Sequence, residues 1–477
     1  MKESVSEIEA LFSGLINKSE ILTAISQLTI EQDVEAYLVG GFVRDYLLDR
    51  PSKDIDILVI GAGIPFATML RNKVGKGDLS VFKNFGTAQL KIGDFELEFV
   101  GARKESYRKT SRKPTVEEGS LADDIARRDF TVNALAFPLN PQKSTALIDF
   151  YDGLKDLKNQ CLRTPLEASE TFSDDPLRMM RAIRFATQLH FQIEKETFAA
   201  IKANAQRIKI ISKERITEEL NKILASPKPS IGFKLLEESG LLAYFLPELQ
   251  ALKGVETVKG IGHKDNFYHT LEVLDNVAEE SKNLWLRWAA LMHDIAKPPT
   301  KRFDENHGWT FHGHEVVGVK MTEQIFRRLK LPLNEKLKFV QKMVRLHLRP
   351  IPLTMEVSDA ALRRLVVDAG EDLDSLFVLC KADITSKNEV RKETYRKRFD
   401  EVRKKMQEVE EKDNLRNFKP PIDGQDVMDT FQLKPGKAIG IIKAAVREAI
   451  LNGDIPNERE AALRYMQEKG SRILENT

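Results

Sequence analysis

The chain has 477 residues, more than one hydrophobic core normally serves, so we expect about two to four domains. Its 42% hydrophobic residues are typical of a soluble globular protein, its 31% charged residues are on the high side, and a net charge of +2 does not by itself indicate a nucleic-acid partner. The two cysteines, Cys161 and Cys380, are far apart, which argues against a disulfide framework and a thiolate zinc site and fits a reducing compartment.

The N-terminal segment MKESVSEIEALF is acidic and amphipathic, unlike a signal peptide. The longest uncharged run, Ile57–Leu70, is shorter than a membrane span and is interrupted by Gly and Pro. We therefore expect a cytoplasmic protein without a membrane partner. Its oligomeric state is not fixed by the sequence.

The first 150 residues mix strand and helix patterns. Helices are predicted near 41–48 and 66–73, and short strands at Tyr37–Val39, Asp54–Ile60, Thr87–Ile92 and Phe95–Val100. Beyond about residue 155 strand signals nearly vanish, and amphipathic helices follow one another. The predicted fold class is α+β: an α/β head with a mixed sheet and flanking helices, then an all-α body. We place domains at 1–150, 151–255, 256–400 and 401–477.

Three acidic residues in the predicted head are candidates for a metal site. Asp54 and Asp56 lie two apart in the strand pattern DIDILVI, so both carboxylates point to one face while Ile55 and Ile57 point into the core. Glu98, in FELEFV, is a third acid on a neighbouring strand. Converging acids need a cation between them, and oxygen ligands favour Mg²⁺ for in-line phosphoryl transfer.

A glycine pair precedes these acids. Gly40 and Gly41 allow backbone amides to approach phosphates closely, and Arg44 adds a guanidinium beside them. Each feature alone is common in turns and on exposed surfaces. Their combination favours a nucleotide triphosphate.

The segment DDIARRDFTVNALAF, residues 123–137, places Arg127, Arg128 and Asp129 in an apolar context. A structural Arg–Asp pair at a helix entry is one interpretation. The functional alternative has Arg128 on a phosphate and Asp129 near a ribose.

In SDDPLRMMRAIRFATQLHF, Ser173 or Asp174 is the predicted N-cap of a helix. An acid and three arginines at intervals of three then form a drifting stripe along this helix: Asp175, Arg178, Arg181 and Arg184. A solvated face is the default interpretation. Alternatively, a carboxylate can accept from an exocyclic amino group while a guanidinium donates to the adjacent ring nitrogen, which selects cytosine and adenine.

The ordered set LVGGFVRDYLL, DIDILV, ARRDFTVNALAF, DDPLRMMRAIRFA and ERITEELNKIL resembles the class II tRNA nucleotidyltransferases, the CCA-adding enzymes. The bacterial poly(A) polymerases share most of it. The resemblance covers roughly residues 25–250. Its first acid of the DDPLR motif is Asp174, where the family usually has Glu.

The resemblance implies a role for each matched residue. Gly41 and Arg44 would contact the triphosphate, Asp54 and Asp56 would bind Mg²⁺, and Arg128 would contact the nucleotide. Asp175 and Arg178 would act as the protein template for the base, with Arg181 and Arg184 beside them. The implied partners are tRNA, ATP and CTP. The segment 101–124, basic and then acidic, is either a free loop or the family's mobile loop, whose presence favours an enzyme that completes CCA or adds the final A.

A second candidate site lies in the predicted helical body, where seven of the eight histidines fall between 263 and 347. His293 and Asp294 end the apolar run LWLRWAALM, where a charged pair needs a cation or a partner. The order His…His-Asp…Asp resembles the HD-type metal-dependent phosphohydrolases, which implies a divalent metal of open identity. The implied ligands are His269, His293, Asp294 and Asp383; His314 and His347 would serve a second metal or a phosphate.

The predicted function is therefore addition of CMP and AMP to the tRNA 3′ end by two-metal phosphoryl transfer. The four ranges then become a nucleotidyltransferase head, a nucleotide- and RNA-binding neck, an HD domain and a tRNA-binding tail. The HD domain is either an active phosphatase or phosphodiesterase or an inert scaffold. Alternatives are a poly(A) polymerase or terminal-A-adding enzyme, and an HD phosphohydrolase whose head only binds RNA. The charged segment 391–416 is a solvated helix or a contact to RNA phosphates.

Overall fold

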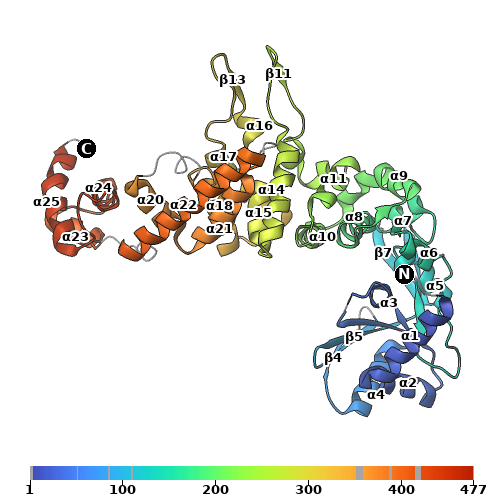
Figure 1. Ribbon diagram of the computed structural model, residues 1–477. Coiled ribbons are helices and arrows are strands. Elements are labelled where there is room, and N and C mark those ends of the chain that lie inside the picture. The colour runs from blue at the N-terminus through green and yellow to red at the C-terminus, as the bar shows by residue number, and fades with distance from the viewer. Residues whose placement is uncertain are drawn as a thin grey trace. The chain divides into compact units, whose positions relative to one another are not determined.

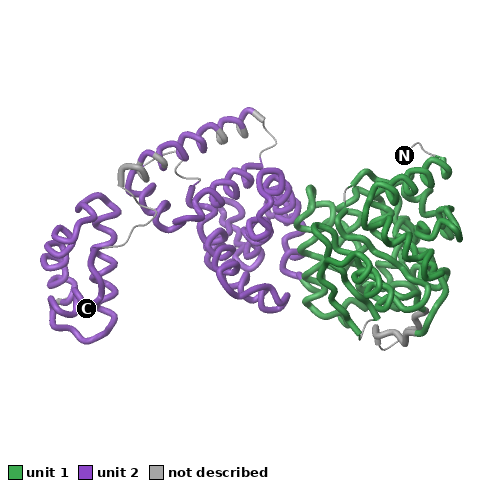
Figure 2. Tube along the Cα trace, turned by 90° about the horizontal axis from the view of Figure 1, so that it is seen from below, with its two compact units in different colours: residues 1–245 green, residues 246–477 purple. Residues whose placement is uncertain are grey.

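The structure is a computed structural model that describes residues 4–50, 52–83, 86–108, 111–350, 358–385, 389–413 and 421–475. The chain forms two compact units, residues 1–245 and 246–477, which are coloured separately in Figure 2. The first unit contains the sheet and the second is almost entirely helical (Figure 1). The predicted α+β fold class is confirmed.

A six-stranded mixed sheet lies at the centre of the first unit, with strand order β3–β4–β5–β2–β1–β8. Strands β2 and β5 are parallel, and the other neighbours are antiparallel. The four predicted strands are confirmed, whereas β3 and β8 were not predicted. The strands are β1 (Ala36–Val39), β2 (Asp54–Val59), β3 (Asp78–Phe82), β4 (Thr87–Ile92), β5 (Phe95–Gly101) and β8 (Ala136–Pro138).

The alternation along β2 and β5 gives the sheet two chemically different faces. Ile55 and Ile57 are buried, as are Leu97 and Phe99 on β5. These apolar side chains share their face with helix α4 (Gly63–Val74), whose Phe66 ring lies 6.0 Å from that of Phe99. The opposite face carries the acids of both strands, because side chains two apart along a strand point the same way.

Helices surround the sheet and continue to the end of the first unit (Figure 1). They are α1 (Val5–Lys18), α2 (Glu20–Glu31), α3 (Gly41–Leu47), α4, α5 (Leu121–Ala126), α6 (Gly153–Lys158), α7 (Ala168–Asp174), α8 (Leu177–Leu189), α9 (Lys195–Asn204), α10 (Lys213–Leu224), α11 (Ser230–Glu238) and α12 (Leu242–Phe245), with 3₁₀ turns at Thr131–Asn133 and Ala205–Ile210.

The segment 101–124 is not a free loop. Strands β6 (Arg103–Arg108) and β7 (Ser111–Glu118) form an antiparallel hairpin, and α5 follows it. At the open end of the hairpin the backbone register pairs Arg103 with Glu118 and Lys104 with Glu117. Residues 109 and 110 lie outside the described residues.

The predicted start of the template helix was wrong. Helix α7 runs through Ser173 and ends at Asp174, and α8 begins at Leu177 after Pro176 in the N-cap position. The carboxylate that accepts a backbone hydrogen bond here is Asp175, whose Oδ1 lies 3.2 Å from the Leu177 amide. The chain therefore bends between two helices at the position of the predicted template acid.

The second unit packs its helices around buried apolar side chains such as Trp288 and Phe326. Its helices are α13 (Pro247–Gln250), α14 (Asn266–Glu280), α15 (Leu284–Met292), α16 (Lys297–Thr300), α17 (His314–Leu329), α18 (Glu335–Leu346), α20 (Asp359–Ala369), α21 (Leu373–Asp383), α22 (Glu389–Asp413), α23 (Gly424–Phe431), α24 (Lys437–Asn452) and α25 (Arg459–Glu475), with a 3₁₀ turn at Gly370–Asp372.

Short strands in the helical body correct the expectation that strands nearly vanish there. Two hairpins are visible beside α14 and α16 in Figure 1: β11 (Thr257–Val258) with β12 (Ile261–Gly262), and β13 (Arg302–Asp304) with β14 (Gly308–Thr310). In the first unit, β9 (Cys161–Leu162) pairs with β10 (Gln192–Ile193). Each is too short for a pattern of period two to stand out in the sequence.

The charged segment is helical, as predicted, within α22, and among the side chains of this helix that the structure describes Phe399, Val402 and Met406 are the buried ones. Residues 414–416 lie outside the described part of the chain. Helices α23–α25 have a small core of their own, which includes Val446 and Met466. Among the described residues, no helix is long and apolar enough to span a membrane.

Candidate active site and metal centre

One cavity of about 760 Å³ in the first unit collects all the residues predicted for the nucleotide site. Its walls come from the acidic face of the sheet, the start of α3, the turn after α5 and helix α8. The predicted residues that line it are Gly40, Gly41, Arg44, Asp54, Asp56, Glu98, Arg128, Asp129, Asp175, Arg178, Arg181 and Arg184. The role of each remains a prediction.

The carboxylates of β2 and β5 lie side by side because the two strands are parallel and in register. Asp56 is paired with Glu98 and Asp54 with Glu96, and all four line the cavity. Burial raises the pKa of Asp56, an effect that Arg128 opposes and Asp54 strengthens. Burial and the Asp56 charge likewise raise the pKa of Glu98. A cluster of oxygen donors that resists ionisation in this way fits a bound divalent cation.

Of the two glycines, Gly40 has the stricter requirement. Its φ is +71°, and an added Cβ would lie 2.8 Å from Nη1 of Arg128 and 3.0 Å from Oδ2 of Asp56. Gly41 begins α3 with ordinary backbone angles, and a Cβ there would meet nothing closer than Arg44 Nη2 at 3.6 Å. The close approach of backbone to charged groups is therefore a property of Gly40.

The two guanidinium groups predicted to meet phosphates are held by acids. Arg44 is buried and donates to both Asp45 oxygens at 2.8 Å and to Asn133 Oδ1 at 2.6 Å. Arg128 Nη2 lies 3.1 Å from Oδ2 of buried Asp124. These contacts fix both positive groups on the cavity wall before any ligand is bound.

Asp129 is paired with Arg181 of α8. Arg181 Nε and Nη2 lie 2.7 and 2.6 Å from Asp129 Oδ2, and Asn133 Nδ2 donates to Oδ1 at 2.9 Å. Burial alone would raise the pKa of Asp129, but Arg181 and the hydrogen bonds lower it to about 2. The structural interpretation, an Arg–Asp pair, is confirmed with Arg181 as the partner, and a role near a ribose stays a prediction for a residue that borders the cavity.

The residues of the predicted arginine stripe all line the cavity, so the stripe is not a solvated face. Arg178 Nη2 donates to the Arg127 carbonyl at 2.6 Å. Arg184 lies 2.7 Å from Oε2 of buried Glu219 on α10 and 3.9 Å above the Phe185 ring. Burial lowers the pKa of Arg184.

Sequence reasoning missed several residues that line this cavity or hold its arginines in place. Asp45 and Asn133 orient Arg44, and Glu219 orients Arg184. Arg215 and Lys222 of α10 also line the cavity. A signal existed for α10, since Arg215 and Glu219 lie four apart and both fall in the ERITEELNKIL segment.

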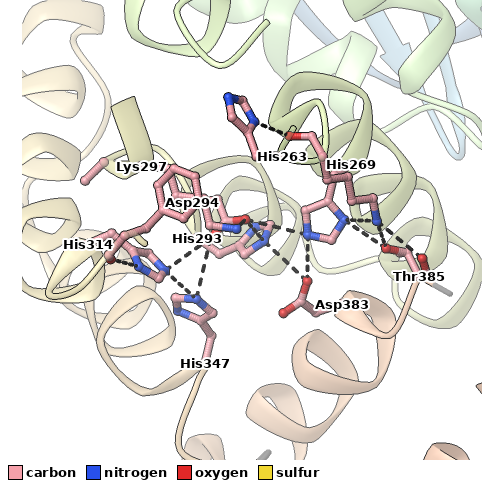
Figure 3. Close-up of polar contacts among 12 residues, drawn as sticks. His263, His269, His293, Asp294, Lys297, His314, His347, Asp383 and Thr385 are labelled. Atoms are coloured by element: carbon pink, nitrogen blue, oxygen red, sulfur yellow. Dashed lines mark hydrogen bonds and ion pairs between the residues drawn. The ribbon is translucent and has the colours of Figure 1, made fainter. Parts of the chain in front are cut away.

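In the second unit, all six predicted histidine and aspartate residues meet at one place (Figure 3). They come from α14, the turn after α15, the start of α17, and the ends of α18 and α21. Their ligand atoms form two groups, within each of which the atoms lie less than 4.8 Å apart: His269, His293 and Asp383, and Asp294, His314 and His347.

Three of these imidazoles are oriented by backbone carbonyls. The Nδ1 atoms of His293, His314 and His347 lie 2.7, 2.8 and 2.7 Å from carbonyl oxygens of the preceding turn. Each ring therefore directs Nε2 toward the cluster, the arrangement that metal-ligating histidines use. Nε2 of His293 has no hydrogen-bond partner, although Asp294 Oδ2 lies 3.2 Å away.

The charged groups of the cluster shift one another's pKa values. Burial lowers the pKa of His293, but Asp294 and Asp383 outweigh it and raise that pKa to about 10. Burial, assisted by the His293 charge, lowers the pKa of His347 to about 4. Lys297 Nζ, 2.6 Å from Asp294 Oδ2, supplies a further positive charge. Imidazole and carboxylate donors that are this buried fit a divalent transition metal.

The cluster also contains contacts that the sequence did not suggest. Lys264 Nζ lies 3.0 Å from Nδ1 of His269 and contacts Thr385 Oγ1. Thr385 Oγ1 itself lies 2.9 Å from His269 Nδ1. His269 is therefore oriented by side chains from two segments far apart in sequence, a relation that spacing alone cannot reveal.

Three family models match the chain in succession. The poly(A) polymerase head domain matches residues 36–163. The probable RNA and SrmB-binding site of polymerase A matches 190–253, and the HD domain matches 266–388. The ranges of the first two models contain most of the residues that line the cavity described above, and the range of the third contains all six residues of the histidine cluster.

Two curated relatives cover nearly the whole chain, and a third covers about two thirds of it. The A-adding tRNA nucleotidyltransferase of Deinococcus radiodurans is 33% identical over 441 residues, 89% of this chain and 94% of the relative. The CC-adding tRNA nucleotidyltransferase of Thermus thermophilus is 30% identical over 92% of this chain and 94% of its own length. The multifunctional CCA protein of Haemophilus influenzae is 36% identical over 63% of this chain and 71% of that protein.

Solved structures agree with these relatives. The CCA-adding enzyme of Bacillus stearothermophilus in complex with CTP has a TM-score of 0.65 and 25% identity, over 96% of this chain and 98% of that one. A tRNA nucleotidyltransferase complexed with a primer tRNA and an ATP analogue has a TM-score of 0.57 and 26% identity, over 80% and 98% of the two chains. The chain therefore belongs to the family of tRNA nucleotidyltransferases and poly(A) polymerases, and it carries an HD domain in its second half.

Proposed function

We propose that the first unit adds CMP and AMP, taken from CTP and ATP, to the 3′ end of tRNA without a nucleic-acid template. One observation carries the proposal: the acids Asp54, Asp56 and Glu98 of the sheet share a single cavity with Asp175 and Arg178 of α8. The A-adding, CC-adding and multifunctional CCA relatives support tRNA as the acceptor. These substrates would place the reaction in the cytoplasm.

In this proposal Asp54 and Asp56 hold Mg²⁺, because a set of oxygen donors alone suits this ion, and Glu98 lies beside them. Bound Mg²⁺ would neutralise the triphosphate and lower the pKa of the attacking hydroxyl. Arg44 and Arg128 position the phosphates. The 3′-hydroxyl oxygen of the tRNA attacks the α-phosphorus, the bond to the β-phosphate oxygen breaks, and pyrophosphate leaves while the hydroxyl proton passes to solvent.

The base would be selected by the Asp175 and Arg178 side chains. Asp175 would accept a hydrogen bond from the amino group of cytosine or adenine, and Arg178 would donate to the neighbouring ring nitrogen. Uracil and guanine present the reverse order of donor and acceptor there. A single pair of side chains thus serves both nucleotides of the CCA end.

The test is incorporation of labelled nucleotides into two acceptors, a tRNA that lacks CCA and a tRNA that ends in CC. The proposal expects two C residues and one A on the first acceptor and one A on the second. Long A tracts would identify a poly(A) polymerase. Absence of incorporation on both acceptors would reject nucleotide transfer altogether.

A terminal-A-adding enzyme is the second possibility within this class. The 33% identity to the A-adding relative of D. radiodurans favours it, and the hairpin β6–β7 occupies the segment where the resemblance implies a loop needed for A addition. Incorporation into the CC-ended tRNA alone would select this alternative. Addition of C without A would instead assign the role of the T. thermophilus relative.

For the second unit we propose a metal-dependent phosphatase or phosphodiesterase activity. The observation in its favour is that all six predicted ligands converge, with the Nε2 atoms of His293, His314 and His347 directed at Asp294. Hydrolysis of nucleoside phosphomonoesters and phosphodiesters in the presence of Mn²⁺, measured for the full chain and for His293→Ala, tests it. Equal turnover by both would reject the activity and leave the domain as a scaffold.

A further inference from the structure

The phenyl ring of Phe185, on helix α8, lies close to three guanidinium groups. The Cζ atoms of Arg184, Arg44 and Arg181 lie 3.9, 4.9 and 5.4 Å from the ring centroid. All three distances are within the range of a cation–π interaction, about 6 Å. We propose that Phe185 is a positioning residue for nucleotide binding, whose ring holds these three arginines together in the cavity wall.

The ring joins two parts of the cavity that come from different segments of the chain. Arg44 belongs to α3, which follows the glycine pair, and its predicted contact is the triphosphate. Arg181 and Arg184 belong to α8, which has the predicted template residues near its start. Phe185 therefore connects the wall predicted for the phosphates with the wall predicted for the base. This inference rests on the nucleotide transfer proposed above.

Ion pairs alone do not bring the three guanidinium groups together. Each arginine has a carboxylate partner from a different segment: Asp45 for Arg44, Asp129 for Arg181 and Glu219 for Arg184. Each carboxylate orients its own arginine. The Phe185 ring is the contact that all three arginines have in common.

The three arginines repel one another, and the ring offsets part of this repulsion. Burial lowers the pKa of Arg184, and the charges of Arg181 and Arg44 lower it further, while Glu219 acts in the opposite direction. The face of an aromatic ring carries partial negative charge and attracts cations. Unlike a further carboxylate, the ring has no net charge, so it would not repel a triphosphate bound to the same arginines.

The ring itself is held in place. Phe130, which is fully buried, packs against it edge-on, with ring centroids 5.9 Å apart and an interplanar angle of 83°. Phe185 lines the cavity, but the residue is only 6% exposed. A nucleotide base therefore has little ring surface to stack on, and the ring acts on the ligand through the arginines around it.

Apolar packing is the competing interpretation of Phe185. Helix α8 also buries Met179, Met180 and Ile183, so a leucine at position 185 would serve a purely apolar role nearly as well. A cation–π interaction depends instead on the negative charge of the ring face. Fluorine atoms withdraw that charge while the ring keeps its position and nearly its volume. The two interpretations therefore predict different responses to fluorination.

The experiment uses the full-length chain in which the phenylalanine at position 185 is replaced by analogues with one, two or three ring fluorines, and also Phe185→Leu. Equilibrium binding of CTP and of ATP is measured without tRNA, and kcat/KM for incorporation is measured with the two tRNA acceptors described above. We expect the affinity for both nucleotides to fall with each added fluorine, by about tenfold in total, because every cation–π contact weakens. Phe185→Leu should lower the affinity at least as much.

Phe66 provides the matched control. It is a buried phenylalanine of the same unit, but it lies on the opposite face of the sheet from the acids, where its ring is 6.0 Å from that of Phe99. The same fluorine series at position 66 should leave nucleotide affinity unchanged. Melting curves identify a variant that fails to fold, and the fluorinated series decides even if Phe185→Leu is such a variant.

An affinity that does not depend on the number of fluorines at position 185 would overturn the proposal, because apolar packing predicts this result. An affinity that rises with fluorination would also overturn it, by indicating that the ring stacks on the base. A graded loss of affinity without incorporation into either tRNA would support the role of Phe185 while rejecting the proposed transfer. Normal incorporation with a flat series would reject the role of Phe185 alone, and a parent that binds neither nucleotide would reject both.

Discussion

The cavity of the first unit and the histidine cluster of the second both bring carboxylates close together, but their surroundings differ. In the first unit the acids stand on open strands, and Asp54 and Glu98 are exposed. In the second unit five of the six candidate ligands are buried and Asp383 is partly buried, and imidazoles contribute four of the six side chains. In the proposed metal sites, the first would leave ligand positions for a substrate, whereas the protein would supply most ligands of the second.

The difference extends to what holds each site in place. In the first unit, charged partners fix the charged groups: Asp45 holds Arg44, Asp124 holds Arg128, and Asp129 holds Arg181. In the second unit, backbone carbonyls three residues earlier in the chain orient the rings of His293, His314 and His347. Ion pairs hold charged side chains in place for a substrate that binds and leaves. Hydrogen bonds from imidazole to backbone carbonyls are the usual way to orient histidines that would hold a metal permanently.

The strongest test of this comparison is to remove the carboxylates Asp54 and Asp56 of the first unit. We expect Asp54→Ala or Asp56→Ala to lower nucleotide incorporation by more than about 1,000-fold, because charge on the transferring phosphate is then left unbalanced. Binding of tRNA should survive, which a filter-binding measurement with the same protein checks. Normal turnover in either variant would refute the metal role of these acids.

A second, smaller effect is the loss of stability expected when one of the buried ion pairs of the first unit is broken. Glu219→Ala leaves the mostly buried Arg184 without its carboxylate, and loss of one partner of such a pair costs about 3–5 kcal/mol. All three tryptophans lie between 285 and 309, so fluorescence follows only the second unit, whereas circular dichroism follows both. Urea should unfold the first unit earlier by circular dichroism while the fluorescence transition stays unchanged.

Lys222→Ala is the matched control for Glu219→Ala. Lys222 lies 3.2 Å from the same carboxylate, but its side chain is 49% exposed, so its loss should cost about 1 kcal/mol or less. Equal destabilisation by the two variants would mean that burial of the Arg184 pair is irrelevant.

Selectivity gives the next effect in size. Asp175→Ala should reduce discrimination against UTP and GTP by about 10- to 100-fold, the range expected for loss of a paired base contact. Its effect on tRNA affinity should be smaller, because Asp175 lies in the cavity wall rather than in the predicted tRNA-binding tail. Ratios of kcat/KM for the four nucleotides provide the measurement, and unchanged ratios would remove the template role.

The features that could be predicted from the sequence are local ones. Asp54 and Asp56 share a face because a strand repeats every two residues, and the α8 stripe follows from intervals of three. The hairpin β6–β7 escaped prediction because it lacks hydrophobic alternation. Its signal was the charge reversal, since the register places Arg103 opposite Glu118.

Partners distant in sequence could not be predicted in the same way. Asn133 reaches Arg44 across 89 positions, and Thr385 reaches His269 across 116. Such pairs form only when helices and strands pack together, and the spacing of residues in a single sequence does not reveal which distant residues will meet. The wrong N-cap has a related cause: Ser173 and Asp174 have capping side chains, but α7 already contains them.

The smallest predicted effect is a pH dependence of stability in the first unit that the second unit should not share. The ion pair with Arg181 holds the pKa of Asp129 at about 2 in the folded chain, against about 3.8 when unfolded. Since the unfolded state binds the proton more tightly, this stabilisation is complete above about pH 5 and is lost as the pH falls toward 2.

Asp129→Asn removes this dependence. The difference in free energy of unfolding between the parent and the variant should therefore shrink by about 1 kcal/mol between pH 6 and pH 3. Urea unfolding monitored by circular dichroism measures it, and tryptophan fluorescence should show no such change because Asp129 lies in the first unit. A constant difference across this range would show that the carboxylate of Asp129 is not held by charge, and the contrast between ion-pair and carbonyl orientation would then fail at this buried residue.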